Sequence, residues 1–335
     1  MTNILSKIKT LSFVSICTIT FNRRPFIKYL KESIKQQTYQ GDIEWIIIDD
    51  GTDKIEDLIQ DVDFVKVRYF KYDNKMSISK KRNLSNSLSK GDIIIYFDDD
   101  DYYPPERIEH AVTSLNNNPD YLIAGCNTMY IYFKDTKNMY SFGPYGKYHS
   151  TAASFAFKKE LLTMTNFNDK DCLSEEKFFL KNYTIPLIQL NPLKTILVFR
   201  HIHNSFDKNE LLNKNINSLS KLTRDIKINS FMKDKELIKF YTEDLDNLLL
   251  PYYQGEVSNK PDIVESIKKT SSLRKKMLET QNCNNNNNDN DKIIYNKKYV
   301  DELKEHYENI IKNKTLLINN LLLKIKELKE LKELK

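Results

Sequence analysis

Four consecutive carboxylates, Asp98 to Asp101, directly follow a run of apolar residues at 93–97 in this 335-residue chain. An apolar run of this length, preceded by Gly91, is typical of a buried strand, so the four side chains should emerge together where the strand ends. Four like charges this close repel one another and raise one another's pKa unless a cation or several donors neutralise them. A hard divalent cation with oxygen ligands would do so. The pattern therefore predicts a metal site, and a solvated acidic loop is the alternative.

Two further groups of charged residues accompany this stretch. A second apolar run, 43–48, also ends in carboxylates, Asp49 and Asp50. A basic pair, Lys81 and Arg82, lies between the two runs, and an acidic pair, Glu175 and Glu176, follows later in the chain. One chemistry would use the set together: a cation stabilises a diphosphate leaving group while a carboxylate takes a proton from the attacking hydroxyl.

Strands and helices that alternate over the first hundred residues would position these side chains. Apolar and β-branched runs predict strands at 13–21, 43–48, 64–70 and 93–97, and helical spacing predicts helices at 25–35 and 77–89. This order predicts right-handed βαβ crossovers and a mainly parallel sheet with its ligand edge at the strand C-termini. Further along, the acidic pair falls on a predicted helix at 172–183, with Ser174 as a good N-cap.

Composition excludes several classes of protein. The net charge of +6 comes from 52 basic and 46 acidic residues that are intermixed, which gives little support to a nucleic-acid partner, and none is predicted. The four cysteines are far apart, which argues against a disulfide framework and a thiolate zinc site. Neither a secretion signal nor an apolar run long enough to span a bilayer is found, so a soluble, cytoplasmic protein is expected.

The second part of the chain changes in character. Residues 207–280 predict a helical extension, and the Asn-rich stretch 281–291 predicts a disordered linker because it is too polar to bury. Residues 292–335 carry apolar positions at a rough 3-4 spacing, which predicts a coiled coil and a homo-oligomer. A lone amphipathic helix docked on the same chain is the alternative for this last segment.

Over residues 13–207 the order of these motifs resembles the inverting family 2 glycosyltransferases with a GT-A fold, including relatives encoded by large DNA viruses. The resemblance implies that residues 1–206 form an α/β, Rossmann-like domain with a mixed, mainly parallel sheet flanked by helices. It implies a hexosyltransferase-class enzyme that transfers a sugar with inversion at the anomeric carbon. The donor would be a UDP-sugar, as is usual in the family, and the acceptor a hydroxyl of a glycan, protein or small molecule. A viral protein of this kind would act in the host cytoplasm or the virion.

The resemblance also assigns residues to the nucleotide-sugar site. The residues that would bind the donor are Thr20, Phe21, Asn22, Asp50, Lys81, Arg82, Asn83, Asp98 and Asp99. Asp98 and Asp100 would hold a divalent cation, Mn²⁺ or Mg²⁺. In His201-x-His203, which a strand would present on one face, His203 is favoured by position as a further metal ligand.

The general base would be Glu175 or Glu176, which stand where the family carries Glu-Asp. Because this chain has Glu-Glu, the choice between the two residues stays open. The alternative is that the two acids only stabilise the first turn of a helix.

At the level of the whole protein, the alternative is a catalytically inactive GT-A-fold protein assembled through its C-terminal helix. A nucleotidyltransferase or phosphohydrolase also clusters aspartates, but it would not need the Arg-Asn helix and the Glu-Glu pair at these spacings. These motifs do not define the donor sugar, the nucleobase of the donor or the acceptor.

Overall fold

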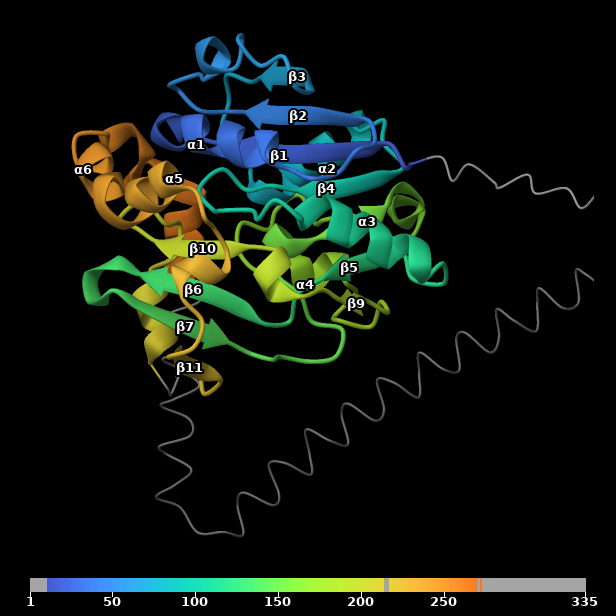
Figure 1. Cartoon of the computed structure of the whole chain (residues 1–335). Helices are drawn as coiled ribbons and strands as arrows, with labels where there is room; N and C mark the ends of the chain where they lie inside the picture. Colours follow the sequence, from blue (N-terminus) through green and yellow to red (C-terminus); the bar gives the residue numbers. More distant parts are fainter. Residues whose placement is uncertain (1–10, 214–216, 270–271, 273–335) are drawn as a thin grey trace, which may run out of the picture. The chain divides into compact units, whose positions relative to one another are not determined.

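The computed structural model describes residues 11–213, 217–269 and 272 (Figure 1). Residues 1–267 form one compact unit and residues 268–335 a second one. The predicted linker at 281–291 and the predicted coiled coil at 292–335 lie outside the described residues, so both stay predictions.

A seven-stranded sheet organises the first unit, with the strand order β3-β2-β1-β4-β8-β5-β9. Its strands are β1 (Val14–Thr20), β2 (Ile43–Asp49), β3 (Lys66–Lys71), β4 (Ile93–Tyr96), β5 (Ile123–Gly125), β8 (Ala156–Lys158) and β9 (Ile188–Gln189). The first four strands are parallel, whereas β8 is antiparallel to both of its neighbours. The predicted mixed, mainly parallel sheet is confirmed.

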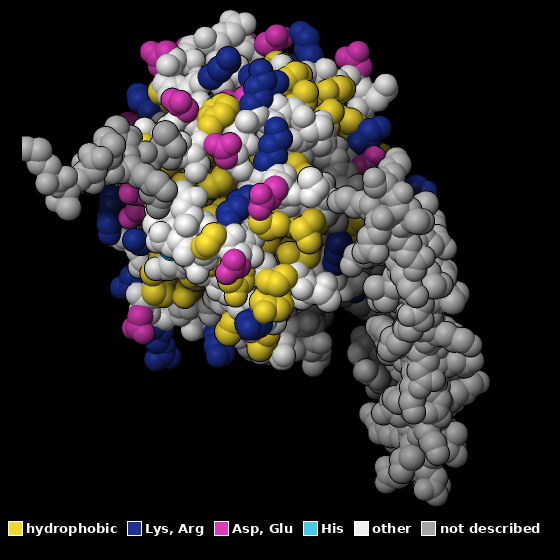
Figure 2. Space-filling model, turned by 90° about the vertical axis from the view of Figure 1, so that its right-hand side faces the viewer, with side chains coloured by type: hydrophobic (Ala, Val, Ile, Leu, Met, Phe, Trp, Pro, Cys, Tyr) yellow, Lys and Arg dark blue, Asp and Glu magenta, His cyan; other side chains and the backbone are white. Residues whose placement is uncertain are grey.

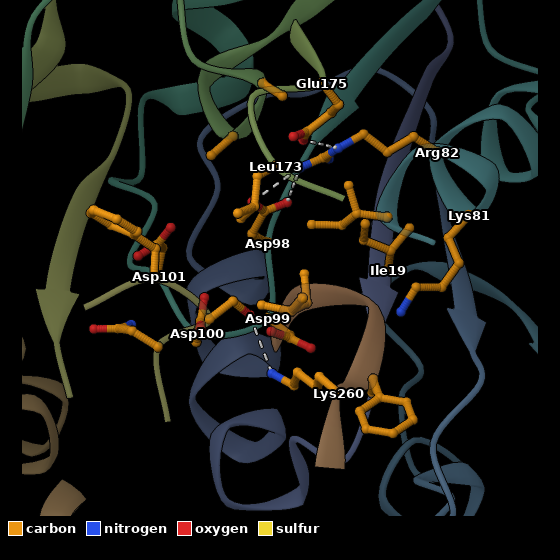
Figure 3. A pocket seen from close by; sticks show the side chains of 18 of the residues that line it. Ile19, Lys81, Arg82, Asp98, Asp99, Asp100, Asp101, Leu173, Glu175 and Lys260 are labelled. Carbon is orange, nitrogen blue, oxygen red and sulfur yellow. Dashed lines mark hydrogen bonds and ion pairs between the residues drawn. The ribbon is translucent and has the colours of Figure 1, made fainter. Parts of the chain in front are cut away.

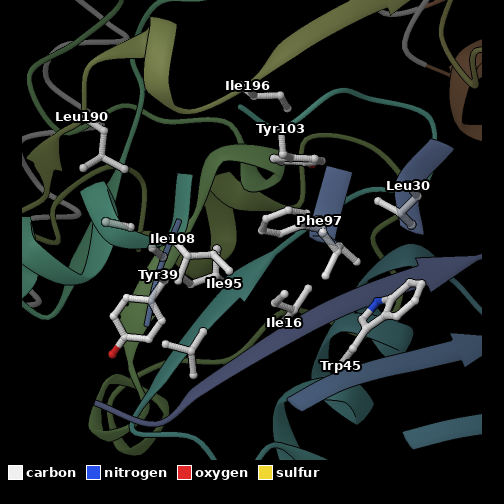
Figure 4. Close-up of a cluster of buried hydrophobic side chains, with 14 of the residues drawn as sticks. Ile16, Leu30, Tyr39, Trp45, Ile95, Phe97, Tyr103, Ile108, Leu190 and Ile196 are labelled. Carbon is white, nitrogen blue, oxygen red and sulfur yellow. The ribbon is translucent and has the colours of Figure 1, made fainter. Parts of the chain in front are cut away.

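Helices cover both faces of this sheet, which is why its central strands are apolar without alternation. On one face, Ile16 of β1 packs in a cluster with side chains of α1 (Arg24–Lys35) and α3 (Arg107–Asn117), as Figure 4 shows for Leu30 and Ile108. On the other face, Ile19 packs in a second cluster with side chains of α2 (Ile78–Leu88) and α4 (Glu176–Phe179). The buried side chains on both faces fix β1 and β4 in the middle of the sheet.

Strand register brings the predicted site residues to one edge. Thr20 at the end of β1 pairs with Asp49 at the end of β2, and Cys17 of β1 pairs with Tyr96 at the end of β4. Because these strands are parallel, their C-terminal ends meet at the same edge of the sheet. Asp50 and Asp98 to Asp101 therefore leave the sheet on the same side.

A second sheet has four strands in the order β10-β6-β7-β11. They are β10 (Leu197–Arg200), β6 (Met129–Phe133), β7 (Asn138–Phe142) and β11 (Ser220–Thr223). β11 lies in the region 207–280, for which only helices were predicted, and it pairs antiparallel with β7. Its sequence gives little strand signal, because Leu222 is its one apolar residue. Leu222 is 49% exposed, so pairing with β7, and not burial, decides the conformation of β11.

The helices of the same region pack on the first two hundred residues. Phe240, Tyr241 and residues of α5 (Lys235–Lys239) and α6 (Leu245–Leu249) share a buried cluster with Phe26. The Phe199 and Tyr241 rings stack with centroids 4.2 Å apart. This packing joins residues 231–249 to β10 and to the start of α1.

The predicted helix at 172–183 is wrong in its extent, because α4 covers only Glu176–Phe179. Ser174 has a φ of 55° and is not the N-cap, a position that Glu175 takes. Past the helix, Lys181, Asn182 and Tyr183 also have positive φ values, which stop it. Such backbone angles are rare for these residue types and leave no periodic signal in the sequence.

On the face shown in Figure 2, basic and acidic side chains are interspersed, as the composition predicted. Among the described residues, no helix has both the length and the apolar character that crossing a membrane requires.

Candidate active site

A cavity at the C-terminal edge of β1 and β4 gathers many of the predicted site residues (Figure 3). Those that line it are Phe21, Lys81, Arg82, Asp98, Asp99, Asp100, Glu175 and Glu176. Asp101, the last of the four consecutive carboxylates, lines the cavity as well. Side chains from β1, α2, the end of β4 and α4 thus face one space, although they are up to about 155 residues apart in the sequence.

Arg82 of α2 connects the two acidic ends of this cavity. Its Nε donates to Glu175 Oε1 over 3.0 Å, and its Nη2 lies 3.2 Å from both carboxylate oxygens of Asp98. The guanidinium is stacked on Tyr96, 4.6 Å from the ring centroid, and Arg82 is 2% exposed. Figure 3 shows this bridge between Glu175 and Asp98. Arg82 therefore fixes Glu175 relative to the aspartates.

Arg23 is a site residue that the sequence analysis missed. It follows β1 directly, and its guanidinium lies 3.6 Å from Asp99 Oδ1 and 3.3 Å from Asp100 Oδ2. Nη2 also donates to the carbonyl oxygen of His203 over 2.8 Å, which holds the buried guanidinium in place. The available signal was a basic residue two positions after the end of the predicted strand 13–21.

The aspartates have unequal electrostatic surroundings. Burial, and then the charge of Asp100, raise the pKa of Asp99 to about 7 against the opposing effect of Arg23. Burial also disfavours the ionised form of Asp100, but His201 and Arg23 outweigh it and hold the pKa of Asp100 below its usual range. Burial and the charge of Asp100 raise the pKa of Asp101 well above its usual range. The crowding predicted from the sequence is thus relieved by two cationic or donor groups and by protonation.

The metal ligands predicted from the sequence are not all brought together. Among the described residues, no group of three or more His, Cys, Asp or Glu side chains is arranged to hold a metal ion. His203 packs beside Gly255 and the Tyr252 ring, outside the cavity lining, whereas His201 Nε2 lies 3.3 Å from Asp100 Oδ2. β10 ends at Arg200, so the two histidines lie on the turn after it and not on one strand face.

The donor chemistry of the aspartates nevertheless fits a hard divalent cation. Asp98, Asp99 and Asp100 present carboxylate oxygens to the cavity, the ligand type that Mg²⁺ and Mn²⁺ prefer. Burial first, and then the charge of Asp100, raise the pKa of Asp99, and Arg23 opposes both effects without cancelling them. A bound cation would relieve that imbalance.

Glu175 and Glu176 both line the cavity but differ in their partners. Glu175 is paired with Arg82. Burial, and then the charge of Glu175, raise the pKa of Glu176 to about 8, while a hydrogen bond with Tyr183 acts in the opposite direction. A carboxyl group with a pKa near the working pH can accept a proton efficiently.

Three of the remaining predicted residues, Asn22, Asp50 and Asn83, have structural partners. Asp50 accepts from Lys81 Nζ over 2.7 Å and from the backbone N–H of Met76 over 2.6 Å. Asn22, which has a φ of 54°, accepts from the backbone N–H of Asp53 and donates to the carbonyl oxygen of Gln254. Thr20, Asn22 and Asp50 do not line the cavity, although all three adjoin residues that do.

Asn83 is also placed outside the cavity lining. Its side-chain amide donates to the carbonyl oxygen of Phe167 and to Asp169, and its oxygen accepts from the Phe167 N–H. Asn83 therefore ties α2 to the loop that leads into α4.

Residues 15–179, from β1 to the end of α4, match the sequence model of glycosyl transferase family 2. This stretch resembles a glycosyl transferase family 2 domain. The matched stretch includes the carboxylates, Arg82 and the Glu175–Glu176 pair, whereas His201 and His203 lie beyond it.

Two curated glycosyltransferases are similar to part of this chain. An uncharacterized glycosyltransferase of Haemophilus influenzae is 31% identical over 107 residues, which are 32% of this chain and 36% of that protein. The glucosyl-dolichyl phosphate glucuronosyltransferase of Haloferax volcanii is 32% identical over 116 residues, 33% of this chain and 36% of that protein. The chain thus spans about a third of the length of each relative that it matches.

Solved structures give more distant likenesses. Residues 1–349 of Staphylococcus aureus TarS in complex with UDP-GlcNAc align with 16% identity and a TM-score of 0.44, covering 56% of this chain and 58% of that one. The mannosyltransferase PcManGT from Pyrobaculum calidifontis, in complex with GDP-Man and Mn²⁺, aligns with 15% identity and a TM-score of 0.46, covering 81% and 80%.

Proposed function

We propose that this protein is a glycosyltransferase that moves a sugar from a nucleotide diphosphate, a UDP-sugar, to an acceptor hydroxyl with inversion at the anomeric carbon. The observation that carries the proposal is one cavity in a family 2 domain, lined by Asp98 to Asp100, Arg82 and the Glu175–Glu176 pair. This cavity offers anionic ligands for a cation at one end and a carboxylate base at the other.

The nucleoside would lie at the Phe21 end of the cavity. Phe21 lines it, and the amino groups of Lys75 and Lys81 lie 5.2 Å and 5.9 Å from the centroid of the Phe21 ring. An aromatic ring with cations beside it suits a nucleotide, because the nucleobase can stack on the ring while the cations lie near the phosphates. Asp50, held by Lys81 and the Met76 N–H, would position this wall.

The diphosphate would lie at the aspartate end. Asp98, Asp99 and Asp100 would hold Mn²⁺ or Mg²⁺, which supplies Lewis-acid stabilisation of the leaving group. Because Arg82 and Arg23 now pair with these carboxylates, both guanidinium groups are close enough to move onto phosphate oxygens when a donor binds.

Glu176 is proposed as the general base and Glu175 as the residue that positions Arg82. The acceptor oxygen would form its bond to the anomeric carbon while the bond from that carbon to the diphosphate oxygen breaks, and the electron pair leaves with the diphosphate. Glu176 takes the proton of the acceptor hydroxyl. Glu175 is less suited to this role, because its carboxylate is already paired with the guanidinium of Arg82.

The test is a screen of sugar nucleotides with the full chain, in which released nucleoside diphosphate is measured with Mn²⁺, with Mg²⁺ and with a chelator. We expect release from one donor class with a cation, and a loss of about a hundredfold or more with the chelator. If sugar nucleotides bind but none is turned over with any acceptor, the protein is a binding protein on this fold. If none binds, the donor site itself is disproved.

A further inference from the structure

The segment that follows α6 returns to the family 2 domain at the donor cavity. Tyr252 donates through its hydroxyl to Asp53 Oδ2 over 2.8 Å, and the Gln254 carbonyl oxygen accepts from Asn22 over 2.9 Å. Eight residues after Gln254, Asp262 pairs with Lys75 over 2.5 Å. We call residues 252–263 the return segment, and these contacts fix it at both ends.

Three residues of the return segment, Lys260, Asp262 and Ile263, line the cavity. They lie about eighty residues beyond the end of the family 2 match at residue 179. Part of the wall of the cavity is therefore built by residues outside the matched domain.

Lys260 is the unusual member of this set. It is only 5% exposed, and its amino group has a hydrogen bond of 3.3 Å to the hydroxyl of Ser205, another lining residue. Within the described part of the chain, no carboxylate oxygen lies within 4.0 Å of this amino group. An ammonium group has three donors, so burial against one neutral hydroxyl is unfavourable unless an anion completes its surroundings.

The other buried cations of the cavity have such partners. Lys81 lies 2.7 Å from Asp50, Arg82 lies 3.2 Å from Asp98, and Arg23 lies 3.3 Å from Asp100. Figure 3 shows Lys260 reaching toward Asp99 and Asp100, on the opposite side of them from Arg82 and Glu175. Its amino group thus faces the end of the cavity that would hold phosphates.

We propose that Lys260 binds a phosphate group of the nucleotide diphosphate donor, as a contact that the return segment adds to the family 2 domain. This inference rests on the proposed function. Lys260 is not needed to fasten the segment, because Tyr252, Gln254 and Asp262 already do so. Its charge is therefore available to a ligand.

The experiment measures the affinity of the full chain for UDP and GDP, with uridine and guanosine as phosphate-free comparisons, by calorimetry in the presence of Mg²⁺. Lys260→Met should weaken binding of the preferred diphosphate by about tenfold or more, since a charge-assisted contact is lost. Binding of the matching nucleoside should change by less than about twofold, and Lys260→Arg should retain most of the diphosphate affinity. Lys235→Met, at an exposed lysine of α5, is the matched control and should bind like the wild type.

The outcomes separate this inference from the proposed function. If Lys260→Met binds the diphosphate as tightly as the wild type, or if it loses diphosphate and nucleoside affinity equally, Lys260 is not a phosphate ligand. If the wild type binds neither diphosphate, the proposed donor site fails, and the role of Lys260 fails with it.

Discussion

Glu175 and Glu176 are neighbours of the same residue type with different electrostatic surroundings. Glu175 is paired with Arg82, whereas burial and the charge of Glu175 raise the pKa of Glu176 to about 8. Two carboxyl groups whose surroundings differ in this way are typical of separate roles in catalysis. The sequence predicted the pair but could not separate its members, because the difference depends on which of them meets a guanidinium from another helix.

The pKa of Glu176 leads to a prediction about pH. A general base must be deprotonated, so kcat/KM for the donor, which reports the pKa of the free enzyme, should rise with pH through about 8 and level off above it. The hydrogen bond with Tyr183 lowers the pKa of Glu176, so Tyr183→Phe should move this rise to higher pH. The measurement is kcat/KM for the donor against pH at saturating cation, because a bound cation keeps Asp99 ionised and removes its titration near 7.

The control for this profile is Tyr253→Phe, at a tyrosine that is 65% exposed. This substitution should leave the rise in rate at the same pH as in the wild type. Glu176 would be excluded as the base if the rate falls as pH rises from 6 to 8. It would also be excluded if the rise in rate occurs at the same pH in Tyr183→Phe as in the wild type.

Arg23 gives a prediction about stability. It pairs with the buried Asp99 and the partly buried Asp100, so Arg23→Met leaves both carboxylates without their guanidinium and should cost about 3 kcal/mol. Mg²⁺ should recover part of this loss, because a cation that binds only the folded state stabilises it. The free energy of unfolding in urea, with and without Mg²⁺, measures both effects.

Arg24 offers a matched comparison for Arg23. It pairs with Asp53 and Asp57 and is partly exposed, so Arg24→Met should cost less stability, and Mg²⁺ should stabilise this variant only as much as it stabilises the wild type. A Mg²⁺ response of Arg23→Met no larger than that of Arg24→Met would show that no cation replaces the guanidinium at the aspartates.

At the scale of elements, the sequence predicted what depends on local pattern. The apolar runs of β1, β2 and β4 and the spacing in α1 and α2 are strong signals, and the carboxylates at the strand ends followed from them. It did not predict the short α4, which positive φ values end, or β11, which its partner β7 holds in place. It also missed Arg23 and Lys260, because a buried cation is recognised by its neighbours in space and a lysine or arginine in a sequence is usually solvated.

The return segment depends on a close approach at Gly255. A Cβ on Gly255 would lie 2.7 Å from His203 Nδ1 and 2.9 Å from the backbone oxygen of Asn22, which cannot move without displacing the end of β1. Gly255→Ala should therefore lower the free energy of unfolding by about 1–3 kcal/mol. It should also weaken diphosphate binding, because Lys260 lies five residues further on.

Gly146→Ala is the control for this close approach, since a Cβ there would meet only His149 Cβ at 3.9 Å, an ordinary contact. Urea unfolding of both variants makes the comparison. A Gly255→Ala protein as stable as Gly146→Ala would show that the segment has room to shift.

At the scale of the whole molecule, residues beyond the family 2 match complete the fold as well as the cavity. β11 pairs with β7 in the second sheet, α5 and α6 share a buried cluster with Phe26 of α1, and the return segment lines the cavity. The interspersed charges on the face in Figure 2 favour no nucleic-acid surface there.

The assembly state is a separate prediction from the sequence of residues 292–335. If this segment forms a coiled coil, the full chain should be a homo-oligomer, and replacing the seam residues Leu317 and Leu321 with Glu should give a monomer. Light scattering after size-exclusion chromatography measures the mass. A full chain that is already monomeric would exclude the coiled coil, and Glu327→Gln serves as a conservative control in the same segment.

The central claim is that this cavity transfers a sugar with Glu176 as the base. The most direct measurement is the rate of nucleoside diphosphate release from the preferred donor by the wild type and by Glu176→Gln, with the affinity for the diphosphate measured alongside. The account predicts that the variant loses about 10²- to 10⁴-fold in rate and keeps its affinity. Equal rates in the two proteins would contradict it.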